Sequence, residues 1–543
     1  MTTLPFDTLE AAFRASVARA PMSDVLDVLP ETAAIYGIPA GSWSYARMAA
    51  EVDRLITAYR EAGFGHGHRV GLLLLNRPEF LCHFLALNAL GVSAVPINAE
   101  FRSAELEYLI GHSEIALAVT LPSHREALTE AAARLNITLP LADPAGNGIT
   151  APATPPPRTG APGLSTECAL LYTSGTTGRP KGCVLSNEYF LYAGFWYTTI
   201  GGLCTVREGA ERMLTPLPLT HMNAMAVSTS CMLLSGGCLI LLDRFHPKTW
   251  WDSVRASRAT IVHYLGVMPA MLMGAPADPR DREHSVRYGF GAGVNPRHHV
   301  AFEERFGFPL LEAWAMTETG SGAVVIANHE PRQVGTACFG KAEPQVECRL
   351  VGDDGADVGI DMPGELWVRH AGPNPRFGFF SEYLKDPEAT AEAWAEGWFH
   401  TGDLVRRDAG GDYRFVDRKK NIIRRSGENI AAVEVESVLI QHPAVKAVGV
   451  TAVPDPVRGD EVLALVVVRE GVTADAALAE DLIAFALARL AYYKAPGYVA
   501  FSAALPLTPT EKIQRGALKT LAGGLLEGGQ CLDRRHLKKR QEP

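Results

Sequence analysis

Apolar runs separated by short polar segments dominate the first part of the chain. Residues 69–75 form an apolar, strand-like run, and Pro78 opens a series of apolar residues at helical spacing that ends at Gly91. Residues 92–97 form a second apolar run. Two strands that are apolar on both faces and joined by a helix are typical of a parallel sheet covered by helices on both sides. We therefore expect an α/β fold here.

The pattern changes after Asp417, where a run of basic residues is followed by segments that we expect to be shorter strands and one helix: 445–453, 462–468 and 474–490. We place a domain boundary near Lys420. The predicted fold class is α/β, with a large N-terminal domain of parallel or mixed sheets flanked by helices and a smaller α+β C-terminal domain. The expected division is 1–419 and 420–543.

Composition narrows the class of protein. A chain of 543 residues with 47% hydrophobic and 20% charged residues can fold into two or more globular domains. Its formal net charge of −9 argues against non-specific binding of nucleic acid. The nine cysteines show neither a CxxC pair nor a zinc-like spacing, so we expect reduced thiols in a cytoplasmic protein.

Three segments were considered as targeting or surface features. Residues 1–21 contain acidic residues and no apolar run, unlike a signal peptide. Residues 225–242 are apolar, but their serines and Gly236-Gly237 predict a buried helix, a turn and a strand, so we expect no membrane span. We expect the basic tail 534–540, and likewise Arg425, to be solvated charges.

The strongest chemical signal is the segment that follows a short apolar strand at 168–172. Residues 172–182 read Tyr-Thr-Ser-Gly-Thr-Thr-Gly-Arg-Pro-Lys-Gly. Glycines let backbone N–H groups turn toward an anion, hydroxyls add donors and a lysine adds positive charge, which together suit a polyphosphate. The segment differs from the Walker loop because Lys181 is followed by Gly and Cys rather than by Ser or Thr.

This loop resembles the phosphate-binding signature of the adenylate-forming superfamily, which includes acyl-CoA synthetases, peptide-synthetase adenylation domains and luciferases. Further motifs similar to those of the family follow in the same order over nearly the whole chain: 314–318, 364–369, 399–403, 417–420 and 506–515. Residues 264–268 and 426–430 resemble the crotonobetaine/carnitine-CoA ligase branch.

The resemblance implies a nucleotide site. The residues that would hold ATP are Thr173, Ser174, Gly175, Thr176, Thr177 and Gly178 of the loop, with Lys181, and Gly291, Ala292 and Gly293 against the adenine. Trp314 would stack on the adenine, and Asp403 would accept the ribose hydroxyls with Arg418 nearby. Thr317 would contact the α-phosphate. Glu318, with Thr173, would hold Mg²⁺, since carboxylate and hydroxyl oxygens suit a hard cation.

The resemblance also implies a catalytic lysine, a hinge and an acyl pocket. Lys512 would bridge the acid and the α-phosphate, and Lys420 would be the hinge of a mobile C-terminal domain. The acyl pocket would be formed by His221, Met225, Gly266, Val267 and Met316.

The predicted function is that of an ATP-dependent carboxylic acid:CoA ligase, which forms an acyl-adenylate and then a thioester. ATP, Mg²⁺ and coenzyme A are the expected cofactors and a small carboxylic acid the partner, with a homodimer as a hypothesis. One alternative is transfer of the acyl group to a carrier protein or an amine. A nucleotide-binding regulatory module without turnover is another. The spacing of Gly289, Gly291 and Gly293 fits a dinucleotide-binding enzyme poorly, because the third glycine and the later acidic residue are lacking.

Overall fold

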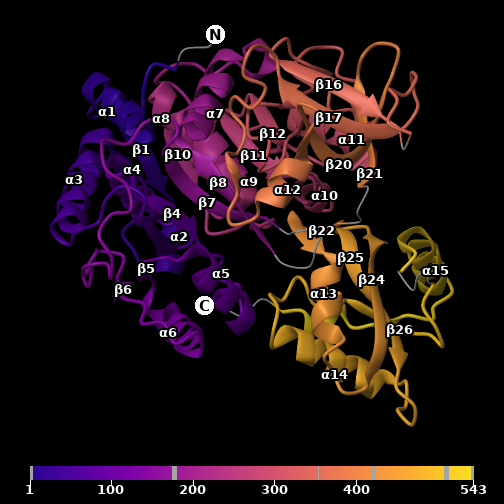
Figure 1. Ribbon diagram of the computed structural model, residues 1–543. Coiled ribbons are helices and arrows are strands. Elements are labelled where there is room, and N and C mark those ends of the chain that lie inside the picture. Colours follow the sequence, from indigo (N-terminus) through magenta and orange to yellow (C-terminus); the bar gives the residue numbers. More distant parts are fainter. Residues whose placement is uncertain (1–3, 174–179, 353, 419–421, 507–512, 540–543) are drawn as a thin grey trace.

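The structure is a computed structural model that describes residues 4–173, 180–352, 354–418, 422–506 and 513–539. A large N-terminal domain of mixed sheets flanked by helices carries a smaller α+β C-terminal domain at one end (Figure 1). The predicted fold class is confirmed. The exact boundary near Lys420 stays a prediction, since 419–421 lie outside the described residues.

Two sheets form the frame of the N-terminal domain. Among the described residues, one has nine strands in the order β15 (Lys341–Ala342), β14 (Val325–Ile326), β13 (Leu310–Trp314), β12 (Tyr288–Ala292), β11 (Ile261–Leu265), β9 (Arg212–Thr215), β10 (Cys238–Leu241), β1 (Asp24–Val28) and β2 (Gly41–Ser44). The other has seven, in the order β18 (Glu382–Tyr383), β8 (Lys181–Ser186), β7 (Glu167–Thr173), β4 (Ser93–Pro96), β3 (Arg69–Leu73), β5 (Leu117–Thr120) and β6 (Leu141–Ala142).

The predicted unit of strand, helix and strand is present as β3, α4 (Pro78–Ala89) and β4. The two strands pair in parallel, with Arg69 opposite Ser93. Helix α4 is buried over nearly its whole length, because its apolar residues face helices on one side and the sheet on the other.

Helices fill the space between the two sheets and cover their outer faces. Helix α7 (Asn187–Thr199) contacts β7 and β8, α8 (Thr229–Ser235) contacts β10, and α1 (Leu9–Arg19) contacts both helices. The remaining helices of this domain are α2 (Pro30–Tyr36), α3 (Tyr45–Glu61), α5 (Ser103–Ser113), α6 (Arg125–Arg134), α9 (Trp250–Ser257), α10 (Val267–Met273), α11 (Pro296–Phe306) and α12 (Pro387–Ala393).

A third sheet completes the N-terminal domain. It contains β16 (Val346–Val351), β17 (Gly364–His370), β20 (Trp398–Arg407), β19 (Trp394–Ala395) and β21 (Tyr413–Arg418). Strand β20 lies between β17 and β21, so Asp403 occupies the middle of the sheet rather than an edge.

The C-terminal domain has its own apolar core. Its strands are β22 (Ile422–Arg425), β23 (Glu428–Ala431), β24 (Val445–Asp455), β25 (Gly459–Val468), β26 (Tyr498–Phe501) and β27 (Leu532–Asp533). Helices α13 (Ala432–Leu439), α14 (Ala476–Leu487) and α15 (Arg515–Glu527) pack on this sheet. The strands expected at 445–453 and 462–468 are present as β24 and β25, which are slightly longer than expected and pair as one hairpin of 11 and 10 residues.

Two of the charges that we expected in solvent, Arg425 and Lys538, are buried. Arg425 is 3% exposed and its Nε donates to Glu461 Oε2 at 2.8 Å. Lys538, in the basic tail, donates to Glu461 Oε1 at 2.5 Å. The sequence could not indicate this, because Glu461 lies on β25, far along the chain from both partners. Through Glu461, these contacts join Lys538 to Arg425 of the β22–β23 hairpin.

The apolar segment 225–242 has the predicted form. It contains a short π-helix at Asn223–Ser228, then α8, a turn at Gly236-Gly237 and β10. Within the described part of the chain, no helix is long and apolar enough to cross a membrane. All nine cysteines are free thiols, as predicted.

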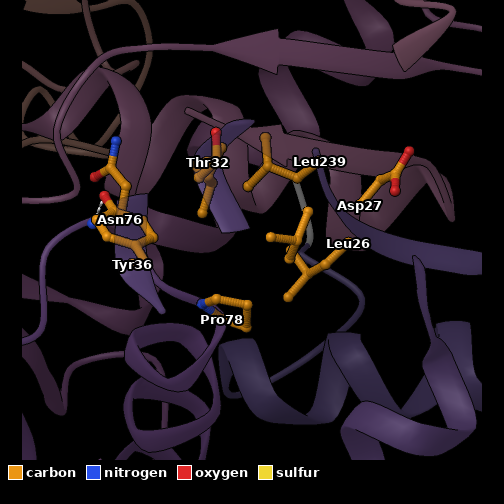
Figure 2. Close-up of a pocket in the computed structure, with 9 residues that line it drawn as sticks. Leu26, Asp27, Thr32, Tyr36, Asn76, Pro78 and Leu239 are labelled. Atoms are coloured by element: carbon orange, nitrogen blue, oxygen red, sulfur yellow. Dashed lines mark hydrogen bonds between the residues drawn. The ribbon is translucent and has the colours of Figure 1, made fainter. Parts of the chain in front are cut away.

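A small hollow lies where β1, β10 and α2 meet, with Leu26, Thr32 and Leu239 among its lining residues (Figure 2). Its volume of about 10 Å³ leaves room for at most one water molecule. It contains none of the residues that the motifs single out, so it is a packing defect rather than a substrate site.

The buried Lys538 generates a prediction about pH. Burial and the charge of Arg425 lower the pKa of Lys538 to about 7. Between this value and the unfolded lysine pKa of about 10.4, the unfolded chain binds more protons, so the free energy of unfolding should rise with pH. Lys538→Met removes this contribution, and the advantage of the wild type over the variant should grow from pH 7 to about pH 9.5 in chemical denaturation. The exposed neighbour Lys539 provides the control, Lys539→Met, which should keep the wild-type pH slope. Identical slopes for all three proteins would contradict the prediction.

Candidate functional site

The predicted phosphate loop joins two paired strands. Strand β7 ends at Thr173 and β8 begins at Lys181, and these two residues face each other across the antiparallel pair. Ser174, Gly175, Thr176, Thr177 and Gly178 lie outside the described residues. The described ends therefore fix where the loop starts and finishes, and they place a hydroxyl and an ammonium group at its base.

Glu318 lies beside the base of this loop. The Thr173 hydroxyl donates to Glu318 Oε1 at 3.3 Å, and the Tyr383 hydroxyl donates to the same oxygen at 3.0 Å. The Lys181 ammonium lies 4.6 Å from the centre of the Tyr383 ring. Thr173, Lys181 and Glu318 are thus brought together, as the motifs predicted.

Tyr383 is a site residue that sequence reasoning missed. It belongs to the two-residue strand β18, which pairs with β8 only because the chain returns to this sheet after about 200 residues. Burial and the negative charge of Glu318 raise the pKa of its hydroxyl, which therefore stays protonated and remains a donor. No local motif marks this residue.

The oxygens at this point suit a magnesium ion. Glu318 is 7% exposed, and it is joined by the Thr173 hydroxyl, a second hard ligand. Within the described residues, no group of three or more His, Cys, Asp or Glu side chains could hold a metal by itself. Magnesium in proteins often takes one or two carboxylates and completes its shell with water and substrate phosphates, which is compatible with this pair.

The turn after β12, predicted to face the adenine, is closely packed against β11. A Cβ atom on Gly266 would lie 1.7 Å from the Gly293 carbonyl oxygen, and one on Gly291 would lie 2.2 Å from the Tyr264 carbonyl oxygen. Gly293 also has a φ of +79°. Only glycine permits this approach of one backbone to another at Gly266 and Gly291, and the positive φ favours glycine at Gly293.

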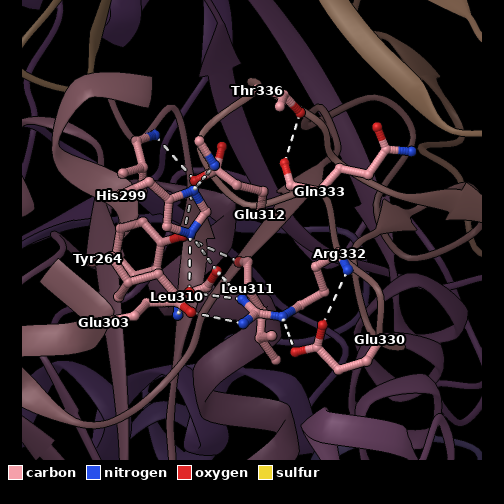
Figure 3. Close-up of polar contacts among 12 residues, drawn as sticks. Tyr264, His299, Glu303, Leu310, Leu311, Glu312, Glu330, Arg332, Gln333 and Thr336 are labelled. Atoms are coloured by element: carbon pink, nitrogen blue, oxygen red, sulfur yellow. Dashed lines mark hydrogen bonds and ion pairs between the residues drawn. The ribbon is translucent and has the colours of Figure 1, made fainter. Parts of the chain in front are cut away.

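A buried carboxylate holds this turn in place (Figure 3). Glu312, on β13, accepts hydrogen bonds from the backbone N–H groups of Gly293 at 2.9 Å and Val294 at 3.0 Å, and from the Tyr264 hydroxyl at 2.9 Å. Burial raises the pKa of Glu312, and the hydrogen bonds oppose that shift. Three successive strands, β11, β12 and β13, are tied together by this one side chain.

Sequence reasoning also missed Glu312, although a signal was present. It is the one charged residue in the run Leu310-Leu311-Glu312-Ala313-Trp314, which otherwise reads as a buried strand. An acidic residue in the middle of such a strand must find hydrogen-bond donors inside the protein.

Trp314 of the motif 314–318 and Asp403 of the motif 399–403 are both predicted to bind the nucleotide, and they are in direct contact. The indole Nε1 of Trp314 donates to Asp403 Oδ2 at 2.9 Å. Asp403 is fully buried, and its backbone N–H donates to the Thr401 hydroxyl. Arg418 pairs with Asp403 across β20 and β21, which brings its backbone to the same place; its side chain lies outside the described residues. Ala292 is the last residue of β12, next to the Gly293 turn.

The predicted acyl residues come from three neighbouring segments. Met225 is buried in the π-helix, Gly266 precedes α10, Val267 begins it, and Met316 follows β13. Met225 belongs to the main apolar core, against which Val267 and Met316 pack. Thr317, next to Met316, uses its carbonyl oxygen to accept a hydrogen bond from the Tyr189 hydroxyl at 2.9 Å. Met225, Val267 and Met316 therefore belong to the same apolar region of the protein. The acyl pocket itself stays a prediction.

His221 faces the C-terminal domain. Its Nε2 lies 3.5 Å from Glu428 Oε2, at the start of β23. Burial would lower the pKa of His221, but the neighbouring carboxylate of Glu428 raises it overall. Gly427, next to Glu428, lies close to Leu265 of β11. A Cβ atom added to Gly427 would lie only 2.1 Å from the Leu265 side chain. The β22–β23 turn thus contacts the N-terminal domain at the predicted acyl site.

Two further predicted residues also lie outside the described part of the chain: the catalytic Lys512 and the hinge Lys420. Their roles stay predictions.

The chain matches two family models in the order that the domains require. Residues 24–380 match the AMP-binding enzyme family, and residues 434–512 match the AMP-binding enzyme C-terminal domain. The protein therefore belongs to the AMP-binding enzyme family.

Relatives and solved structures extend this assignment. A crotonobetaine/carnitine–CoA ligase of Salmonella typhi is 30% identical over 492 residues, which is 88% of this chain and 93% of the relative. An amide bond synthetase from Marinactinospora thermotolerans has a TM-score of 0.79 at 27% identity, with 95% of this chain and 99% of that chain covered. A malonyl-CoA ligase with methylmalonyl-CoA and AMP bound has a TM-score of 0.73 at 28% identity, with 90% and 97% covered.

The contact between Trp314 and Asp403 generates a prediction. Trp314→Phe keeps an aromatic ring but removes the donor to Asp403, and a hydrogen bond to a charged group contributes about 1.5–3 kcal/mol. We expect kcat/KM for ATP to fall about tenfold or more. If Asp403 binds the ribose, the preference for ATP over 2′-deoxy-ATP should also shrink. Trp394→Phe is the matched control, since the Trp394 indole N–H has no hydrogen-bond acceptor within the described residues. An unchanged preference in Trp314→Phe would argue against a ribose-binding role for this pair.

Glu312 generates a second prediction. Glu312→Gln keeps the size of the side chain but places an amide N–H₂ where a backbone N–H now finds an acceptor, at a cost of about 1–3 kcal/mol. We expect a lower melting temperature and a higher KM for ATP. Tyr264→Phe removes only the hydroxyl and leaves both backbone hydrogen bonds, so its effects should be smaller in each assay. A normal KM for ATP in Glu312→Gln would show that the turn does not depend on this carboxylate.

Proposed function

We propose that this protein activates a carboxylic acid with ATP as an acyl-adenylate and then transfers the acyl group to coenzyme A. The observation that carries the proposal is the convergence of Thr173, Lys181 and Glu318 at the base of the phosphate loop, with the Trp314–Asp403 pair in the same domain. These are the residue types needed to hold a triphosphate, a cation and a ribose.

The comparisons support coenzyme A as the acceptor. The Salmonella relative is named a CoA ligase and matches nearly the whole chain, and the malonyl-CoA ligase structure contains both AMP and an acyl-CoA. AMP beside an acyl-CoA is the product pair expected from an adenylate intermediate. The acid that this chain uses is a small-molecule carboxylic acid.

In the first step, a carboxylate oxygen attacks the α-phosphorus of ATP and pyrophosphate leaves. Both reactants are anions, so the site must offset repulsion and the charge that develops on the phosphates. Lys181 and the N–H groups of the loop would bind the β- and γ-phosphates, and Lys512 would bridge the carboxylate and the α-phosphate. Thr317 would contact the α-phosphate. Mg²⁺, when bound, would be held by Glu318 and Thr173 and would supply positive charge to the phosphate oxygens.

In the second step, the thiol of coenzyme A attacks the acyl carbonyl carbon and AMP leaves. The acyl group would lie among Met225, Gly266, Val267 and Met316. His221 would stand at its carboxyl end, where the β22–β23 turn of the C-terminal domain now meets it. We propose that this arrangement corresponds to the thiol-transfer state, which the C-terminal domain reaches by turning about Lys420.

Transfer to an amine is the second candidate, because the amide bond synthetase structure matches 95% of this chain. The acceptor can be assigned by incubating the protein with ATP, an acid panel and either coenzyme A or simple amines. Accumulation of acyl-CoA and AMP would favour the ligase, and amide formation without acyl-CoA would favour the alternative. The cytoplasmic location and a homodimer stay predictions from the sequence.

Lys512 generates a prediction that separates the two steps. Lys512→Ala should nearly abolish acyl-AMP formation, because a charged contact is lost from the transition state of that step. The same variant should convert synthetic acyl-AMP and coenzyme A into thioester at close to the wild-type rate. Lys446→Ala, which removes an exposed lysine of the same domain, is the control and should leave both steps unchanged. An equal loss of both half-reactions in a folded Lys512→Ala protein would contradict a lysine that acts only during adenylation.

A further inference from the structure

A buried group of charges joins the two domains. Lys494 lies in the turn between α14 and β26 of the C-terminal domain, and its ammonium donates to Glu105 Oε1 of the N-terminal domain at 2.6 Å. It also donates to Glu434 Oε1 of its own domain at 2.8 Å. The three side chains are only 6%, 7% and 9% exposed. This cross-domain pair has no place in the two chemical steps above.

The surroundings of Lys494 leave it few other partners. The ring of Phe101 lies on one side, with its centre 5.4 Å from the ammonium. Glu105 is itself fixed at the start of α5, where its other oxygen accepts a hydrogen bond from the Arg102 backbone N–H at 3.0 Å. The lysine therefore meets a carboxylate whose position is set by a helix of the other domain.

The residue next to Lys494 connects this pair to the predicted acyl site. The Tyr493 hydroxyl lies 3.4 Å from the Asn98 side-chain nitrogen of the N-terminal domain. Burial raises the pKa of Glu428, but the neighbouring His221, Lys494 and Tyr493 lower it overall. Glu428 therefore lies 3.5 Å from His221 and near Tyr493, the residue next to Lys494.

We propose that Lys494 is a positioning residue for the thiol-transfer step, because its pairing with Glu105 selects the domain orientation in which the β22–β23 turn faces His221. This inference rests on the two-step ligase function proposed above. It assigns to Lys494 no contact with substrate or with the reacting atoms.

The charges explain how such a contact can be both selective and reversible. A buried ammonium without a partner costs several kcal/mol, so a lysine paired only across the domains would resist separation. Lys494 keeps Glu434 when the domains part, and Glu105 keeps its bond to the Arg102 N–H while water reaches its free oxygen. Separation of the two domains then breaks only the contact between Lys494 and Glu105, and it leaves no buried charge without a partner. The pair favours one orientation without locking it.

The test measures both half-reactions in charge variants of this group. Lys494→Met and Glu105→Gln should each lower the rate of thioester formation from synthetic acyl-AMP and coenzyme A by about tenfold or more, whereas acyl-AMP formation from acid and ATP should change less than about threefold. Combining the two changes should do no further harm, since either one already removes the cross-domain contact. Glu434→Gln is the matched control from the same buried group and should spare the thioester step, because the contact to Glu105 remains.

A charge exchange provides a rescue. In the protein with Lys494→Glu and Glu105→Lys together, the group again has one ammonium and two carboxylates, and the ammonium now reaches across from the N-terminal domain. Thioester formation should recover at least part of the loss seen in Lys494→Glu alone. Melting temperatures of all variants show whether each remains folded.

Three results would overturn the proposal. An equal fall of both half-reactions in folded Lys494→Met and Glu105→Gln would indicate a general structural role. A raised KM for coenzyme A in Lys494→Met with a normal Glu105→Gln would indicate that the lysine contacts coenzyme A itself. Absence of any recovery in the folded charge exchange would exclude the pairing. If the proposed ligase function is wrong, the wild-type protein will release no pyrophosphate from ATP with any acid tested. That result is distinct from the three above, and it would also contradict the positioning role of Lys494.

Discussion

The candidate site depends on three parallel strands that end at one edge of the nine-stranded sheet and are tied there by one carboxylate. Strands β11, β12 and β13 end at Leu265, Ala292 and Trp314, and the segments predicted to meet the acid, the adenine and the phosphate follow directly after them. In open α/β sheets, ligands bind at the carboxyl ends of such strands. Glu312 accepts two N–H groups from the middle turn and a hydroxyl from β11, so the relative positions of these ends are fixed before any ligand arrives.

Backbone contact makes this edge intolerant of side chains. Gly266 and Gly293 approach so closely that any Cβ atom on Gly266 would overlap the opposite carbonyl oxygen. The predicted acyl segment and the predicted adenine turn therefore pack backbone against backbone. A change in either should affect the binding of both substrates, because the turn cannot move without displacing the start of α10.

The other recurrent feature is the pairing of buried charges between segments that are distant in sequence. Arg425 and Lys538 share Glu461, and Lys494 lies between Glu105 and Glu434. Buried ion pairs contribute little net stability, since desolvation offsets most of the attraction, but removal of one partner is costly. Their effect is to discriminate between arrangements. The first group joins Lys538 to β22 and β25, and the second joins one domain to the other.

The sequence by itself determined the fold class and the family, and it predicted a phosphate-binding loop. Apolar runs separated by polar turns are local signals, and they predicted β3, α4 and β4 and the segment from α8 to β10. The motif around Trp314 and Glu318 predicted residues that lie together. Only the tertiary structure decided which distant residues complete them. Tyr383 reaches Glu318 through a two-residue strand, Glu312 finds its donors on other strands, and Lys494 meets Glu105 nearly 400 residues away in sequence. The expected solvation of Arg425 and Lys538 was wrong for the same reason: a charged residue reads as exposed until its buried partner is known, and that partner is brought to it by sheet pairing and domain packing rather than by any pattern along the chain.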